Sequence, residues 1–106
     1  MLIFRLSQTS NNTYDTYDSC VVTAPDEDAA RSIFPGRGDD SVRVNIENDC
    51  WEEWTWTEDI HQTKDWMIVD MTHSAWALPS QITVELIGVA LPDAVAGVVC
   101  ASFNAG

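Results

Sequence analysis

Residues 20–34, CVVTAPDEDAARSIF, place a strand directly before a helix and so decide the fold class. The run Cys20–Thr23 is apolar and rich in β-branched residues, which is typical of a strand. Thr23–Asp26 fits a capping box, and the acids after it lie where the helix dipole favours negative charge. A stripe of apolar residues at helical spacing follows, formed by Ala29, Ala30, Ile33 and Phe34. The pattern predicts a helix over about 26–34, which Pro35–Gly36 ends.

Further strands are predicted on both sides of this segment. Before it, Leu2, Phe4 and Leu6 recur at a period of two, and a polar link over residues 13–18 leads to the strand at Cys20. After it, alternation or a short apolar run predicts three more strands, at 42–46, 82–87 and 98–103. We expect the last two strands to pair with each other.

These elements add up to a single α+β domain over residues 1–106. We expect a mainly antiparallel sheet of about five or six strands, with the helix packed on one face through Ala30, Ile33 and Phe34. A chain of this length buries enough apolar surface for one core without a metal or a disulfide.

The stretch from Trp51 to Trp76 holds all five tryptophans and both histidines. Trp54 and Trp56 share one face if the chain is extended, whereas Trp51 and Trp54 share one face if it is helical. Residues 66–69 form an apolar run too short to separate a buried strand from a helical turn. We favour strand at the tryptophans, while helix stays an alternative for parts of residues 48–76.

The charge balance limits the classes of partner. Seventeen acidic residues against five basic ones leave a formal net charge of −12 at pH 7, which disfavours contact with phosphate backbones and anionic membranes. We expect no direct nucleic-acid binding and no membrane association. The chain starts without the pattern of a signal peptide, and no apolar run approaches a membrane span. The scattered thiols of Cys20, Cys50 and Cys100 favour a reducing compartment, so we predict a cytoplasmic protein.

No set of residues has the spacing of a catalytic or metal site. His61 and His73 lie near carboxylates and a thiol that zinc or iron accept, but their H-x11-H spacing matches no recognised metal pattern. Adjacent carboxylates such as Glu52 and Glu53 point to opposite faces of a strand, which favours a solvated acidic surface over an acid–base pair. We therefore predict no enzyme activity, no metal and no cofactor.

Protein binding is the function that this composition favours. Tryptophan serves core packing and interface anchoring equally well, and a small domain does not easily bury five of them. Exposed tryptophans flanked by carboxylates would form an interface with an acidic rim, whereas core packing is the alternative for each. Two tyrosines in a polar loop offer a second recognition surface, or pack onto the sheet edge. The candidate partner-binding residues are Trp51, Glu52, Glu53, Trp54, Trp56, Glu58, Asp59, Tyr14 and Tyr17.

Several short motifs stand at the two ends of the chain. They are YDTYDS at 14–19 leading into VVTA at 21–24, EDAAR at 27–31, ELIGVA at 85–90 and the ending GVVCASFNAG at 97–106. These motifs resemble a family of small uncharacterised proteins encoded by bacteriophages and prophages, and the ending is the most specific of them. The resemblance implies a viral or prophage origin and expression in the cytoplasm of a bacterial host. It implies no activity and no catalytic residue.

Two functional hypotheses follow. The first is a small acidic phage accessory protein that binds and inhibits a host protein, for instance a bacterial defence component of CRISPR or restriction type, because negative charge suits a basic target. The second is a small virion or assembly component that homo-oligomerises, for instance as a homodimer, through sheet edges or tryptophans. A metal-dependent enzyme is a distant third.

Overall fold

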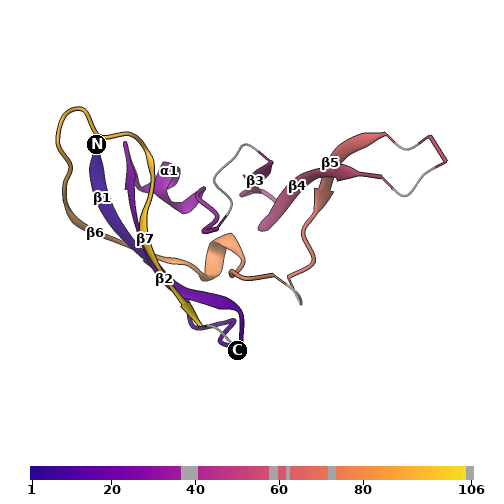
Figure 1. The fold of residues 1–106 in the computed structure, drawn as a ribbon, viewed down its shortest axis with the longest axis horizontal. Helices are drawn as coiled ribbons and strands as arrows, with labels where there is room; N and C mark the ends of the chain where they lie inside the picture. Colours follow the sequence, from indigo (N-terminus) through magenta and orange to yellow (C-terminus); the bar gives the residue numbers. More distant parts are fainter. Residues whose placement is uncertain (37–40, 58–59, 62, 72–73, 105–106) are drawn as a thin grey trace.

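The described residues fold into two antiparallel sheets and one short α-helix (Figure 1). The computed structural model describes residues 1–36, 41–57, 60–61, 63–71 and 74–104. The elements are β1 (Leu2–Ser7), β2 (Thr16–Ala24), α1 (Glu27–Arg31), β3 (Val42–Asn45), β4 (Cys50–Trp56), β5 (Lys64–Ile68), the 3-10 helix η1 (Pro79–Gln81), β6 (Thr83–Val89) and β7 (Gly97–Asn104).

The four-stranded sheet has the order β6-β1-β2-β7. In its centre Phe4 lies opposite Val22 and Leu6 opposite Cys20, and all four side chains are buried on one face. The strand predicted at Cys20–Thr23 begins earlier, at Thr16, and includes part of the predicted polar link. It extends because β7 pairs with this part of β2, with Thr16 opposite Asn104 and Tyr17 opposite Phe103, so backbone hydrogen bonds hold these residues in the sheet.

Strands β6 and β7 lie at opposite edges of this sheet, so the prediction that they pair with each other is wrong. β6 pairs with β1, and β7 pairs with β2. The connection over residues 90–96 is longer than a tight hairpin loop, and it is long enough to cross the ends of the two central strands. β6 and β7 can therefore lie at opposite edges of the sheet, each paired with a strand of the N-terminal half.

The helix α1 is shorter than the predicted 26–34, and Thr23 does not cap it. Asp26 is the N-cap, because its carboxylate accepts a 2.8 Å hydrogen bond from the N–H of Ala29. Thr23 belongs to β2, where its hydroxyl donates to the carbonyl oxygen of Val95. At the other end, the Ser32 hydroxyl donates to the carbonyl oxygen of Ala29, which satisfies a carbonyl of the last turn and ends the helix.

The core lies between α1, the four-stranded sheet and the inner end of β4. Ala30 is buried, and the half-buried side chains of Ile33 and Phe34 pack against the core from beyond the end of the helix. Trp51 and Trp76 are fully buried. The ring of Phe34 meets the ring of Trp51 edge-on, with centroids 5.0 Å apart, and so links the helical segment to β4.

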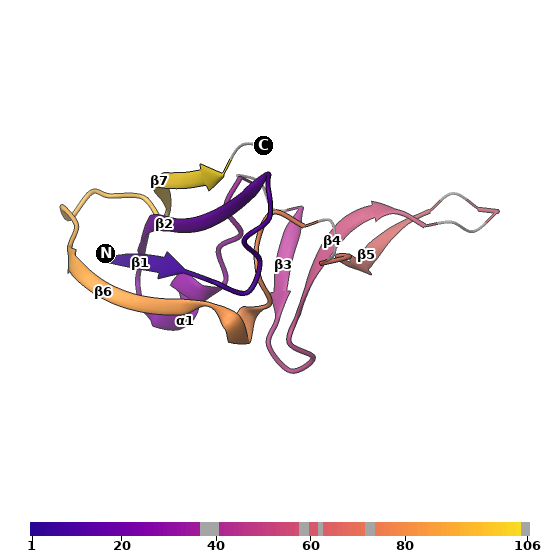
Figure 2. The ribbon, with the colours of Figure 1, turned by 90° about the horizontal axis from the view of Figure 1, so that it is seen from below.

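The three-stranded sheet has the order β3-β4-β5, and its β4–β5 hairpin projects away from the rest of the molecule (Figures 1 and 2). The expected α+β class with mainly antiparallel strands is confirmed. The single sheet of five or six strands is wrong, since the described residues form seven strands in two sheets. Strand is also confirmed for residues 51–56. For the run at 66–69, where strand and helical turn were both open, the structure has strand as far as Ile68. None of the helices in the described ranges has both the length and the hydropathy needed to cross a membrane.

Candidate functional site

One face of the β4–β5 hairpin gathers three tryptophans. Trp54 on β4 lies directly opposite Trp66 on β5, and Trp56 lies opposite Lys64. Because side chains two residues apart point to the same face of a strand, all three indoles share one side. The rings of Trp54 and Trp66 have centroids 5.5 Å apart and an interplanar angle of 60°. We call this surface the tryptophan face, made of Arg43, Glu52, Trp54, Trp56, Lys64, Trp66 and Ile68.

The tryptophan face is open to solvent. Trp56 is 63% exposed and Trp54 is 44% exposed, while Ile68 at the base of β5 is 69% exposed. Single exposed apolar residues are ordinary, but a contiguous group of large ones on one rigid surface is typical of a site for another protein. Its place on a projecting hairpin leaves the approach to it open (Figure 2).

Two cations lie over indole rings of the tryptophan face. The guanidinium carbon of Arg43 is 4.1 Å from the centroid of the Trp66 ring, and the Nζ of Lys64 is 5.2 Å from that of Trp56. Arg43 also donates from Nε to the carboxylate of Glu52 over 2.8 Å. Of the carboxylates predicted for an acidic rim, the described part of this face carries Glu52, which is paired with Arg43. These contacts restrict the indole rotamers before any partner arrives.

Trp51 belongs to the core, which corrects its prediction as a partner-binding residue. The chain is extended here, so Trp51 points to the opposite face of β4 from Trp54. Its indole Nε1 donates a 2.8 Å hydrogen bond to the carbonyl oxygen of Ala77. Trp76 is equally buried, although its Nε1 has no hydrogen-bond partner among the residues that the structure describes.

The remaining predicted site residues do not form one surface. Glu53 is half-buried and faces the same side of β4 as Trp51. Tyr14 is 75% exposed, whereas Tyr17 is half-buried against Phe103, with ring centroids 4.8 Å apart. Two further predicted residues, Glu58 and Asp59, lie outside the described residues.

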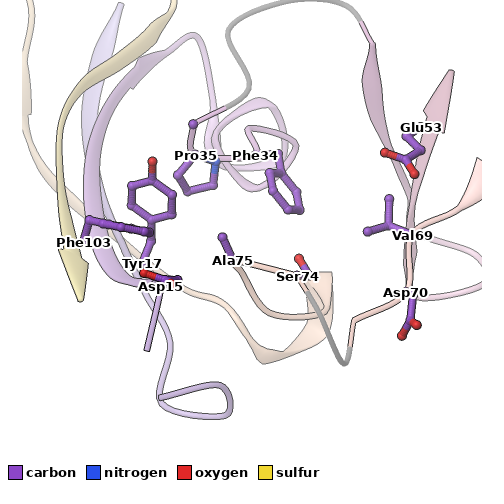
Figure 3. Close-up of a pocket in the computed structure, with 11 residues that line it drawn as sticks. Asp15, Tyr17, Phe34, Pro35, Glu53, Val69, Asp70, Ser74, Ala75 and Phe103 are labelled. Carbon is purple, nitrogen blue, oxygen red and sulfur yellow. The ribbon is translucent and has the colours of Figure 1, made fainter. Parts of the chain in front are cut away.

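A recess of about 490 Å³ is bordered by residues of both sheets (Figure 3). Tyr17 and Phe103 lie on one side of it, and Glu53 projects from the other. The carboxylates of Asp15, Glu53 and Asp70 contribute to its lining, so its potential attracts cations. Each of these three residues already interacts with another group of the chain. Because Glu53 faces away from Trp54, a flat partner bound at the tryptophan face does not reach this recess.

Within the part of the chain that the structure describes, no three histidine, cysteine or carboxylate side chains come together as ligands for a metal ion. Burial raises the pKa of the Cys20 thiol from its ordinary value of 9.0 to about 11, with Cys100 adding to the shift. Burial and then the carboxylates of Glu52 and Asp49 raise the pKa of Cys50 as well. Both thiols are protonated at neutral pH and are poor nucleophiles.

Comparison of the chain with protein-family models, with curated proteins and with solved structures found no match. The tryptophan face is therefore interpreted from its own chemistry. Sequence reasoning proposed Trp54, Trp56 and Glu52 for it, but missed Arg43, Lys64, Trp66 and Ile68. The signal that identifies these four is the strand register, because each occupies a position opposite or next to a predicted residue.

Proposed function

We propose that this chain is a small acidic phage accessory protein that binds a host protein through the tryptophan face and inhibits it in the bacterial cytoplasm. The observation that carries the proposal is the group of three indoles on one side of a projecting hairpin, two of them exposed. The phage origin follows from the resemblance of the terminal motifs. The binding role follows from the chemistry of the face.

Tryptophans are enriched among the few residues that dominate binding free energy at protein interfaces, and truncating one there costs about 2 kcal/mol or more. Arg43 and Lys64 hold two of the rings in place, which reduces the conformational entropy that binding removes. Burying the rings would desolvate these cations too. The partner surface should therefore offer an apolar pocket with a nearby acceptor for Lys64.

The net charge of −12 acts at longer range than the tryptophans. It accelerates association with a basic protein and slows association with an acidic one. A bacterial defence component of CRISPR or restriction type fits this requirement, because its nucleic-acid groove is basic. The net negative charge would thus steer the partner towards the protein, and the tryptophan face would anchor it.

Affinity capture tests the proposal. The wild-type chain and the Trp54→Ala, Trp56→Ala and Tyr14→Ala variants are used as baits in a bacterial lysate, and the captured protein is then purified and assayed for activity. We expect the wild type and Tyr14→Ala to capture and inhibit the same host protein, and each tryptophan variant to bind it at least about 30-fold more weakly. Tyr14 is a matched control, since it is an exposed aromatic residue outside the tryptophan face.

Loss of capture with Tyr14→Ala alone would move the binding surface to the loop that carries Tyr14. Equal capture by all four baits would remove the tryptophan face from the proposal. Capture of phage structural proteins in place of a host protein would favour the second hypothesis, a small virion or assembly component. Circular dichroism checks that each bait is folded, so that loss of binding can be distinguished from loss of the fold.

A further inference from the structure

Strand β7 presents an uncharged, exposed edge. It pairs with β2 on one side, and no other described strand pairs with it on the opposite side (Figure 1). Every residue from Val98 to Asn104 is exposed. The eight residues GVVCASFN contain no charge and no proline, although the chain carries 17 acids. Charges and prolines are the usual protection of an edge strand against pairing with another strand.

The other edge strand of the same sheet is different. β6 carries Glu85, and α1 packs near it, whereas no helix covers β7 among the described elements. The pairing of each edge strand contains an irregularity. The β2–β7 pairing has two, one with an extra residue of β7 at Val99 and one with an extra residue of β2 at Asp18, so only the first inserts a residue into β7. The segment Cys100–Asn104 beyond Val99 is free of charge. Of the two edges, β7 is therefore the one suited to accept a strand.

Charge selects the occupant of this edge. A basic partner would be drawn to the acidic parts of the molecule and has no electrostatic reason to choose an uncharged strand. Two copies of the chain, each with a net charge of −12, repel each other, which favours contact at a surface where neither presents a charge. The β7 edge meets this condition. An antiparallel strand edge is also its own complement under a two-fold rotation.

The solvent-exposed area of the chain is larger than expected for a compact monomer, as it would be if a second molecule normally covered part of the surface. The chain exposes 6838 Å², whereas a compact monomer of 11.8 kDa exposes about 5900 Å². The excess of about 900 Å² is close to the roughly 800 Å² that each partner buries in a stable complex. The projecting hairpin contributes part of this excess, and the exposed apolar side chains of β7, among them Val98, Val99 and Phe103, contribute another part.

We propose that two copies of the chain pair antiparallel through their β7 edges about a two-fold axis, which joins two four-stranded sheets into one continuous sheet of eight. Backbone hydrogen bonds between the two β7 strands supply the contact, and the exposed side chains of Val98 and Phe103 are covered from both copies. The dimer leaves the tryptophan face free. It therefore does not depend on the proposed function, and a dimer would present two tryptophan faces to its targets.

Sedimentation equilibrium over a wide range of protein concentration tests the pairing. We expect the wild type to sediment with twice the mass of the chain, and added salt to tighten the dimer because it screens the repulsion of the acidic surfaces. Ser102→Glu and Ala101→Lys each place a charge on the β7 edge, and each should raise the dissociation constant of the dimer at least about tenfold. The two variants change the net charge in opposite directions, so a shared effect is local to the strand.

Two matched variants separate this surface from the others. Thr83→Glu adds the same charge as Ser102→Glu to an exposed position on the opposite edge of the sheet, and Trp54→Ala removes an anchor of the tryptophan face. Both should keep the dimer intact. A monomeric wild type at all concentrations overturns the proposal, and so does dissociation by Thr83→Glu or Trp54→Ala with the β7 variants unaffected. Far-UV circular dichroism verifies that each variant is folded.

Discussion

The indole Nε1 of Trp51 donates a hydrogen bond to the backbone carbonyl oxygen of Ala77, over 2.8 Å and between two buried residues. The bond joins β4 to the segment that leads into η1, 26 positions later in the chain. On its other side the Trp51 ring meets the edge of Phe34. One side chain thus connects three segments that are far apart in the sequence.

We expect Trp51→Phe to lower the free energy of unfolding by about 2 kcal/mol or more. The smaller ring leaves a cavity, and the carbonyl of Ala77 loses its buried donor. Trp54→Phe makes the same change on the same strand at an exposed position and should cost less than about 1 kcal/mol. Urea denaturation of both variants measures the difference. Equal costs would contradict the placement of Trp51 in the core.

Gly36→Ala is expected to destabilise the fold by roughly 1–3 kcal/mol. Gly36 has a φ of +80°, and a Cβ at this position would lie 2.7 Å from the hydroxyl oxygen of Tyr17. Gly88→Ala is the control, because a Cβ there meets only ordinary contacts with Ile3, the nearest at 3.7 Å. The control should change stability by less than about 0.5 kcal/mol. Thermal unfolding of the two variants measures the difference in stability. A Gly36→Ala variant as stable as the wild type would argue against the positive φ at this position.

The buried thiol of Cys20 predicts a loss of stability at alkaline pH. Its pKa is raised to about 11 in the folded protein from 9.0 in the unfolded chain, so between these values only the unfolded chain releases the proton. The free energy of unfolding should therefore fall as pH rises through this window, by at most about 1.4 kcal/mol per pH unit from this group. Below pH 9 the contribution of the Cys20 thiol to the free energy of unfolding is fully present.

Cys20→Ala removes this contribution, whereas Cys100→Ala alters an exposed thiol and should leave most of the slope, since burial is the larger cause of the shift. Urea denaturation at a series of pH values from 8 to 11 gives the slopes for the wild type and both variants. An identical slope for the wild type and Cys20→Ala would show that the thiol does not titrate as expected.

Local pattern was sufficient for much of the secondary structure. The period of two at Leu2, Phe4 and Leu6 predicted β1, because alternate side chains enter the core. The helix after Pro25 was predicted from its acidic start, but its end was not, since Ile33 and Phe34 have helical spacing and yet reach the core from outside the helix. Which partner a strand takes was also not predictable, as β6 and β7 show.

The sequence by itself determined the content of this protein: mainly strands with one short helix, a strongly acidic surface, and more tryptophans than a small core readily holds. Only the tertiary structure decided which tryptophans are buried. Trp51 and Trp54 are three residues apart, and a strand sends them to opposite faces, one into the core and the other into solvent. The pairing of Trp54 with Trp66 depends on the register of β4 and β5. This register is set by which faces of the strands become buried in the folded protein, and that depends on residues far apart in the sequence. Periodicity shows which side chains lie on the same face of a strand, but not which other segment covers that face.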